Sequence, residues 1–265
     1  MSKLILESTN AAYHADSTHL SSSGLKLLLK DAKQFEHEYI LGNRSNETKE
    51  AYTEGSLTHS LILEPHKVMT DYAVFQGLRR AGKLFEEFKA VNTDKVIVTA
   101  AQMLRCQKLF TAYRSLPVAV SLLEGTLSEH SMVSTILDVP VKARADAISI
   151  SRRCIIDVIT TAMPSDAEVF KQTVQDYMYH LSAALYCQIA FNTYGELHDF
   201  YWLVLSKADN QCHIYKASSE TLSMGTALVT HALVKYKTCL ESGIWKDDIS
   251  QKHLYDTAEY EIVEV

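Results

Sequence analysis

The chain has 265 residues, enough to bury a large core, and we expect residues 1–265 to form a single domain. With 47% hydrophobic residues, 22% charged residues, nine Gly and four Pro, the composition argues against long disordered linkers. The net charge of −6 excludes a protein that holds nucleic acid through an overall positive charge, so any such contact would be local.

Targeting signals and disulfides are not expected. The sequence has no run of 18 apolar residues, and residues 1–13 lack the features of a signal peptide, which predicts a cytoplasmic protein with no membrane contact. Cysteines occur at scattered positions without a CxxC pair, which disfavours a zinc or iron–sulfur site and suggests reduced thiols. They are Cys106, Cys154, Cys187, Cys212 and Cys239.

Basic residues gather in three short clusters that could contact phosphates locally. The alternative for each cluster is a solvated surface charge. The clusters are Arg79, Arg80 and Lys83, then Arg105 and Lys108, then Arg152 and Arg153.

The first 120 residues are predicted to be mainly helical. A serine-rich start followed by spaced leucines indicates a capped amphipathic helix over residues 21–42. Further helices are expected at about 53–63, 83–90 and 100–115, the last stopped near Pro117.

Residues 121–246 are predicted to form an α/β core. Three β-rich runs at 132–137, 141–150 and 154–160 indicate a meander. Ser165 and Glu168 form a capping-box pattern that begins a long helix, whose apolar face continues to Ile189. Strands at 200–206 and 212–217 and a helix at 223–240 follow, and residues 247–265 form an acidic tail. This order predicts an α/β sandwich with a mixed sheet.

Two aspartates on neighbouring predicted strands are the first candidate site. Alternation places Lys142, Arg144 and Asp146 on one face of their strand, and Asp157 shares a face of the next strand with Ile159. If the strands pair as a hairpin, the two acids lie roughly 5 Å apart.

Together with a backbone carbonyl such as that of Val158, these acids would suit Mg²⁺ or Mn²⁺. Such ions stabilise the attacking and leaving oxygens in phosphodiester cleavage, where a lysine commonly orients or deprotonates the water. The alternative is that Asp146 and Asp157 cap strand ends or pair with Arg144.

Several segments, in order, carry a resemblance to a known family. They are Ser21-Ser22-Ser23-Gly24-Leu25-Lys26, Gly55-Ser56-Leu57-Thr58-His59-Ser60-Leu61-Ile62-Leu63-Glu64-Pro65, Val141-Lys142-Ala143-Arg144-Ala145-Asp146, Ile155-Ile156-Asp157-Val158-Ile159-Thr160-Thr161 and Tyr179-His180-Leu181-Ser182-Ala183-Ala184-Leu185-Tyr186. The chain resembles the nuclease domain of exonuclease VIII (the RecE type). That domain lies within the PD-(D/E)XK superfamily, which also includes lambda exonuclease and the RecB nuclease domain.

The resemblance implies a PD-(D/E)XK core, a central mixed sheet flanked by helices with an N-terminal helical region. It implies that Asp146 and Asp157 bind the metal with the Val158 carbonyl, that His59 reaches the metal, and that Glu129 is an accessory acid. Without the family, His59 is better explained as a buried or interface histidine.

Two positions depart from the family pattern. Ile159 stands where the family has its lysine, and a hydrocarbon neither donates a hydrogen bond nor exchanges a proton. Ser182 replaces a glutamine, whereas Tyr186, one turn further, is retained.

Three accounts of Ile159 stay open. A cation from elsewhere could substitute, with Lys142 a better candidate than Lys171, which is eleven residues from Ser182 and thus roughly 16 Å away along a helix. Alternatively, the protein has kept binding and lost cleavage, or the lysine was removed deliberately.

The resemblance implies a Mg²⁺-dependent deoxyribonuclease that degrades linear duplex DNA from 5′ ends in recombination or phage DNA metabolism. A homo-oligomeric ring around DNA and a single-strand annealing partner would accompany that activity, in the cytoplasm of a bacterial or phage-infected cell. The competing hypotheses are a non-catalytic DNA-binding or partner-binding protein on the same fold, and an unrelated α/β domain.

Overall fold

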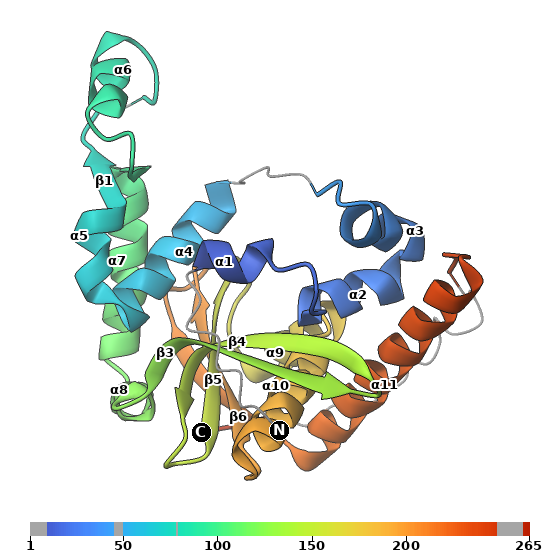
Figure 1. Cartoon of the computed structure of the whole chain (residues 1–265). Coiled ribbons are helices and arrows are strands. Elements are labelled where there is room, and N and C mark those ends of the chain that lie inside the picture. Colours follow the sequence, from blue (N-terminus) through green and yellow to red (C-terminus); the bar gives the residue numbers. More distant parts are fainter. Residues whose placement is uncertain (1–9, 45–49, 78, 248–261) are drawn as a thin grey trace.

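The computed structural model describes residues 10–44, 50–77, 79–247 and 262–265. Its centre is a six-stranded sheet of order β3-β4-β5-β6-β7-β8, in which β5 and β6 are parallel and the other neighbours antiparallel. The strands are β3 (Leu127–Ile136), β4 (Val139–Ser149), β5 (Cys154–Thr161), β6 (Asp199–Ser206), β7 (Cys212–Ala217) and β8 (Ile262–Glu264). The predicted mixed sheet flanked by helices is confirmed (Figure 1).

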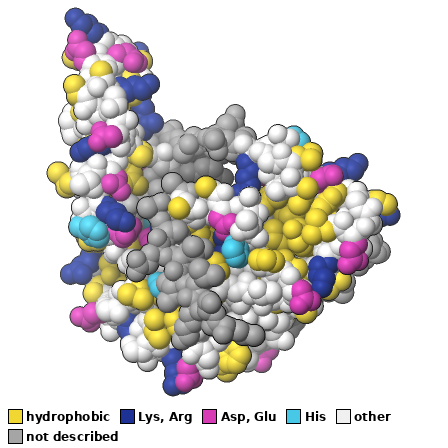
Figure 2. All heavy atoms as spheres, viewed as in Figure 1, with side chains coloured by type: hydrophobic (Ala, Val, Ile, Leu, Met, Phe, Trp, Pro, Cys, Tyr) yellow, Lys and Arg dark blue, Asp and Glu magenta, His cyan; other side chains and the backbone are white. Residues whose placement is uncertain are grey.

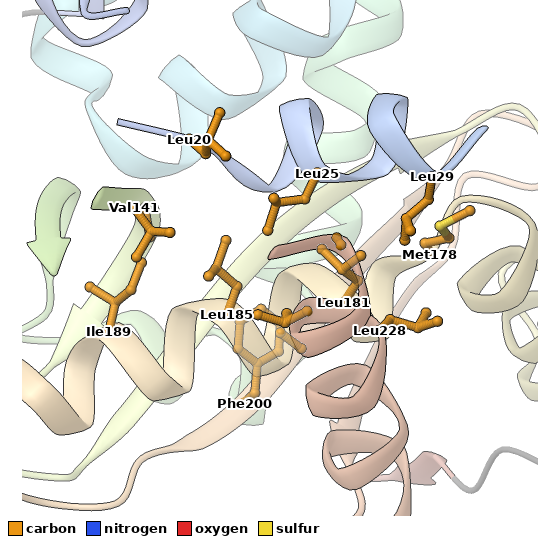
Figure 3. Packing of buried hydrophobic residues seen from close by; sticks show 14 of the residues in the cluster. Leu20, Leu25, Leu29, Val141, Met178, Leu181, Leu185, Ile189, Phe200 and Leu228 are labelled. Atoms are coloured by element: carbon orange, nitrogen blue, oxygen red, sulfur yellow. The ribbon is translucent and has the colours of Figure 1, made fainter. Parts of the chain in front are cut away.

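Helices cover both faces of this sheet. One face packs against α2 (Ser22–Lys30), α9 (Ala167–Asp176), α10 (Tyr179–Tyr194) and α11 (Ser219–Ser242). Figure 3 shows Leu25 and Leu29 of α2 above Leu181 and Leu185 of α10, within the larger apolar cluster. The other face packs against α4 (Glu50–Leu63), α7 (Ala100–Arg114) and α8 (Pro117–Leu123).

Part of the chain projects beyond the sheet. It comprises α5 (Val68–Asp71), β1 (Tyr72–Phe75), α6 (Lys83–Ala90) and β2 (Val96–Thr99), with β1 and β2 paired in parallel beside α7 (Figure 1). The remaining short elements are α1 (Asn10–Ala15), α3 (Ala32–Phe35), a π-helix (Glu36–Ile40) and a 3₁₀ helix (Pro65–Lys67).

The long helix expected from the capping box at Ser165 is two helices. Met178 adopts a left-handed conformation with φ of 48°, which separates α9 from α10 and so interrupts the apolar helix face that was predicted to continue to Ile189. The N-cap is Asp166, whose side chain accepts a hydrogen bond from the Val169 amide. The straight-helix distance between Lys171 and Ser182 therefore does not apply, because the two residues lie on different helices.

Other boundaries also differ from those expected. The helix predicted over residues 21–42 breaks at Asp31, whose side chain caps the next helix by accepting from the Gln34 amide. β3 begins five residues earlier than predicted, and Pro117 starts α8 after α7 ends. Most of the predicted acidic tail lies outside the described residues, but residues 262–264 form β8 on the sheet edge. None of the described helices combines the length and hydropathy that a membrane-spanning helix requires.

Candidate active site

The candidate site lies at the point where β4 and β5 stop pairing, which we call the β4–β5 fork. The paired residues run from Ala147 and Ile156 to the turn that connects the two strands. Asp146, just before Ala147, and Asp157, just after Ile156, are the first residues beyond the end of this pairing. At this point the Val158 amide donates a hydrogen bond of 2.7 Å to Asp146 Oδ2, a side-chain oxygen, and not to a backbone carbonyl of β4. The carboxyl groups of Asp146 and Asp157 interact directly. The structure thus brings together the two acids that the strand pattern predicted would converge.

Two further ligand types reach the same point. His59 of α4 places Nδ1 3.5 Å from Asp146 Oδ2. Glu129 lies within β3, at a break in its ladder with β4, and has a positive φ of 53°. One ligand atom from each of His59, Glu129 and Asp146 lies within 4.8 Å of the others. Arg144 Nε is 2.8 Å from Glu129 Oε2 and offsets part of the negative charge.

The surroundings of Asp146 and Asp157 disfavour their charged forms and raise the pKa of both carboxyl groups. Burial raises the pKa of Asp146 to about 7, and the charge of Glu129 adds to this effect. Burial, followed by the charge of Asp146, raises the pKa of Asp157 to about 7. Burial lowers the pKa of His59, so its imidazole is neutral and keeps a lone pair at neutral pH. Crowded carboxylate oxygens beside a neutral imidazole fit a divalent cation such as Mg²⁺ or Mn²⁺.

Comparisons with known proteins assign the chain to a family. The model of a family described as a "PDDEXK-like domain of unknown function" matches residues 21–252. The chain belongs to this family. No curated protein sequence matches it.

Solved structures of similar fold extend the comparison. A candidate exonuclease from Eubacterium rectale is 14% identical, with a TM-score of 0.69, over 97% of this chain and 95% of its own. SSO0001 is similar over 50% of this chain and 66% of its own, at 13% identity and a TM-score of 0.31. The first of these shares the fold of this chain over nearly the whole length of both proteins. PDDEXK nucleases usually use divalent metals, which agrees with the donor set of His59, Glu129 and Asp146.

Lys142 is not directed at the acids of the PDDEXK-like site. Its ammonium donates to the backbone carbonyls of Tyr13 at 2.7 Å and Asp16 at 2.6 Å, and it lies 3.4 Å from the Asp16 carboxylate. Its side chain is almost fully buried. Lys142, which was predicted as a substitute for the missing lysine, therefore binds the backbone of the N-terminal segment to β4.

The two positions that depart from the family motif are both buried. Ile159 lies on β5 in the same apolar cluster as Leu25 of α2, whereas Val158 belongs to the cluster on the opposite face. Ser182 lies inside α10. The predicted ligand role of the Val158 carbonyl stays a prediction, while its amide is engaged with Asp146.

Tyr186, retained from the family motif, lies beside the acids. Its hydroxyl shares a hydrogen bond with the Ser22 side chain of α2, and burial holds its pKa well above the usual value. The charges of Asp157 and Asp146 act on it in the same direction. Tyr186 thus links the acids to the N-terminal helix.

Lys26 was not identified as a functional residue from the sequence. It lies on α2, partly buried, with Nζ 5.1 Å from the centre of the Tyr179 ring. Burial lowers its pKa to about 8, and the charge of Asp157 opposes that shift. The available signal was its place in the opening-helix motif, but no sequence pattern shows that this helix faces β5.

Several residues of the basic clusters have internal partners. Arg80 donates to the Ile97 carbonyl, Arg105 pairs with Glu54, and Arg152 donates to carbonyls near the end of α8. Arg153 lies 3.3 Å from Glu196. On the face in Figure 2, basic and acidic side chains are interspersed over the projecting part. These four arginines therefore have intramolecular partners whether or not they also contact phosphates.

Proposed function

We propose that the protein is a deoxyribonuclease of the exonuclease VIII type, acting with Mg²⁺ or Mn²⁺ on the ends of linear duplex DNA and degrading one strand in the 5′ to 3′ direction. The observation that carries this proposal is the cluster of His59, Glu129 and Asp146, with Asp157 against it, at the β4–β5 fork. Recombination or phage DNA metabolism, in the cytoplasm of a bacterial or phage-infected cell, would be the setting.

The residues at the β4–β5 fork would have different roles in metal binding and in orienting the ligands. Asp146, Asp157 and His59 would hold the cation, with the Val158 carbonyl and Glu129 beside them. The chemistry that such an ion would supply is polarisation of the scissile phosphate and activation of water for attack. The Val158 amide fixes the orientation of Asp146, and Arg144 fixes that of Glu129. Tyr186 and Ser22 close the side of the site that faces α2.

The proposal is tested with end-labelled linear duplex DNA and Mg²⁺ or Mn²⁺. We expect the protein to release labelled nucleotides, and Asp157→Ala to abolish the release because it removes a ligand. Asp94→Ala changes an exposed aspartate outside the site and serves as the matched control. Substrates labelled at the 5′ end and at the 3′ end of the same strand are compared, because early release of the 5′ label shows that degradation runs from 5′ to 3′. If neither the protein nor Ile159→Lys cleaves DNA with either metal, the nuclease proposal fails.

Ile159 favours a second candidate function. Because this side chain cannot act on water, the protein could be an inactive relative that binds DNA or a partner such as a single-strand annealing protein. This candidate predicts Mn²⁺ binding without cleavage, and cleavage only after Ile159→Lys.

A homo-oligomeric ring is part of the main proposal, since a chain of net charge −6 needs its few cations concentrated around the polyanion. Sedimentation velocity tests this directly, with a monomer at all concentrations as the contrary result.

A further inference from the structure

Position 159 on β5, where the family has its lysine, carries the uncharged side chain of Ile159. Asp157 and Ile159 are two residues apart on this strand, so they point to the same side of the sheet. Ile159 lies there in the apolar cluster that includes Leu25 of α2. The helix that covers this side therefore determines what groups face Asp157.

Lys26 lies next to Leu25 on that covering helix. Its positive charge acts on Asp157, and Asp157 acts on it in return. Its ammonium lies over the ring of Tyr179, a residue whose own hydroxyl is affected by the charge of Asp157. Lys26, Tyr179 and Asp157 thus form one local cluster built from α2, α10 and β5.

Other nearby cations are committed elsewhere. Lys142 is bound by the carbonyls of Tyr13 and Asp16, and Arg144 is paired with Glu129. Lys30, one turn after Lys26 on the same helix, is exposed and donates to the Asp176 carbonyl at 3.3 Å. Among the described basic residues of α2 and β4, Lys26 is the one whose charge acts on Asp157.

We propose that Lys26 is a catalytic residue that supplies, from α2, the ammonium group missing at position 159. This inference rests on the proposed nuclease function. In the reaction, the water oxygen bonds to phosphorus while the phosphorus–oxygen bond to the leaving strand end breaks. The proton lost by the water is matched by the proton that the leaving oxygen takes from solvent. Lys26 stays protonated and donates a hydrogen bond to the scissile phosphate, which stabilises the negative charge that develops there.

The test compares five proteins on labelled duplex DNA with Mn²⁺: the unchanged chain, Lys26→Gln, Ile159→Lys, Lys26→Gln with Ile159→Lys, and Lys30→Gln. We expect Lys26→Gln to lower the cleavage rate by roughly a hundredfold or more, the range for loss of one positioned catalytic group. Lys30→Gln, on the same helix, should cleave normally. The double variant should recover cleavage, because a lysine at 159 replaces the lost charge, whereas a purely structural defect would not be rescued in this way.

Each contrary result has a distinct meaning. If Lys26→Gln cleaves as fast as the unchanged chain, Lys26 is not catalytic, and the nuclease function stands. If the unchanged chain is inactive while Ile159→Lys cleaves, the site is a nuclease site that Lys26 does not complete. If Lys26→Gln does not fold, comparison of the unchanged chain with Ile159→Lys decides: the inference expects rates within about tenfold, and a gain of more than about a hundredfold overturns it. Inactivity of all the proteins refutes the nuclease function itself.

Discussion

The amide of Val158 and the carboxylate of Asp146 are joined by a 2.7 Å hydrogen bond across the point where β4 and β5 separate. This bond gives Asp146 a structural task in addition to its proposed metal ligation. The neighbouring strand supplies no backbone acceptor at this position in the β4–β5 ladder.

The two tasks of Asp146 are separable by substitution. Asp146→Asn keeps an oxygen that accepts from Val158, whereas Asp146→Ala leaves a buried donor unpaired. We expect the alanine variant to be less stable than the asparagine variant by about 1–3 kcal/mol, measured by urea unfolding. Both variants should lose Mn²⁺ binding in calorimetric titration. Equal stability of the two would show that the hydrogen bond contributes nothing.

Asp146 and Asp157 should contribute stability to the metal-free protein that is lost as the pH rises from about 4 to about 7, opposite in sign to the contribution of buried histidines such as His59 and His180, whose pKa values burial lowers. Asp146 and Asp157 have pKa values raised to about 7, so the folded protein holds protons that the unfolded chain has already released. Urea unfolding with EDTA at several pH values measures this. Asp157→Asn should make the slope of stability against pH more positive in this range, because it removes one of the two carboxyl groups whose pKa is raised. An unchanged slope in that variant would contradict the assignment.

Metal should reverse this trend. Carboxylates and imidazole bind a cation only when deprotonated, so Mn²⁺ should raise the melting temperature more at pH 8 than at pH 5. The comparison needs the same protein concentration and a saturating metal concentration at both pH values. A larger effect at pH 5 would exclude binding through these acids.

His59 should contribute directly to metal affinity. His59→Ala removes a neutral nitrogen ligand, and we expect the Mn²⁺ dissociation constant to rise by roughly tenfold or more. His66→Ala is the matched control, since His66 follows α4 closely in sequence but is exposed. Similar affinities in both variants would place His59 outside the metal site.

Lys142 should matter for folding more than for chemistry. Lys142→Met leaves the carbonyls of Tyr13 and Asp16 without their donor, which should cost about 1–3 kcal/mol in urea unfolding. Limited proteolysis should then cut the N-terminal segment before α2 more readily. A stable variant that no longer cleaves DNA would instead support a catalytic role for Lys142.

The sheet and the pair of acids were predictable, because both depend on local patterns. Alternating residues mark β4 and β5, and a short connection fixes their register, which brings Asp146 beside Asp157. The break at Met178 was not predictable, because a left-handed methionine carries none of the usual signals of glycine or proline. The β1–β2 pair was missed since each strand has only four residues.

The surroundings of the acids depend on contacts between distant parts of the chain. Glu129 sits at a ladder break whose positive φ has no sequence signature. Lys142 is fixed by carbonyls more than 120 residues away in the chain. The charge of Lys26 acts on Asp157 only because α2 packs against α10 and α11. Sequence periodicity shows which face of a helix is buried but does not show what that face meets.

The crossover between β5 and β6 has a consequence for synthesis on the ribosome. β5, which carries Asp157, is held on one side by β6, and β6 ends at Ser206. A nascent chain that has emerged only as far as α10 therefore already contains Lys26, His59 and both aspartates, but it lacks the strand that holds β5 in place. Any activity of the proposed site would begin only after β6 has been translated through Ser206 and has left the exit tunnel, so the proposed nuclease could not act on nearby nucleic acid before this strand is in place.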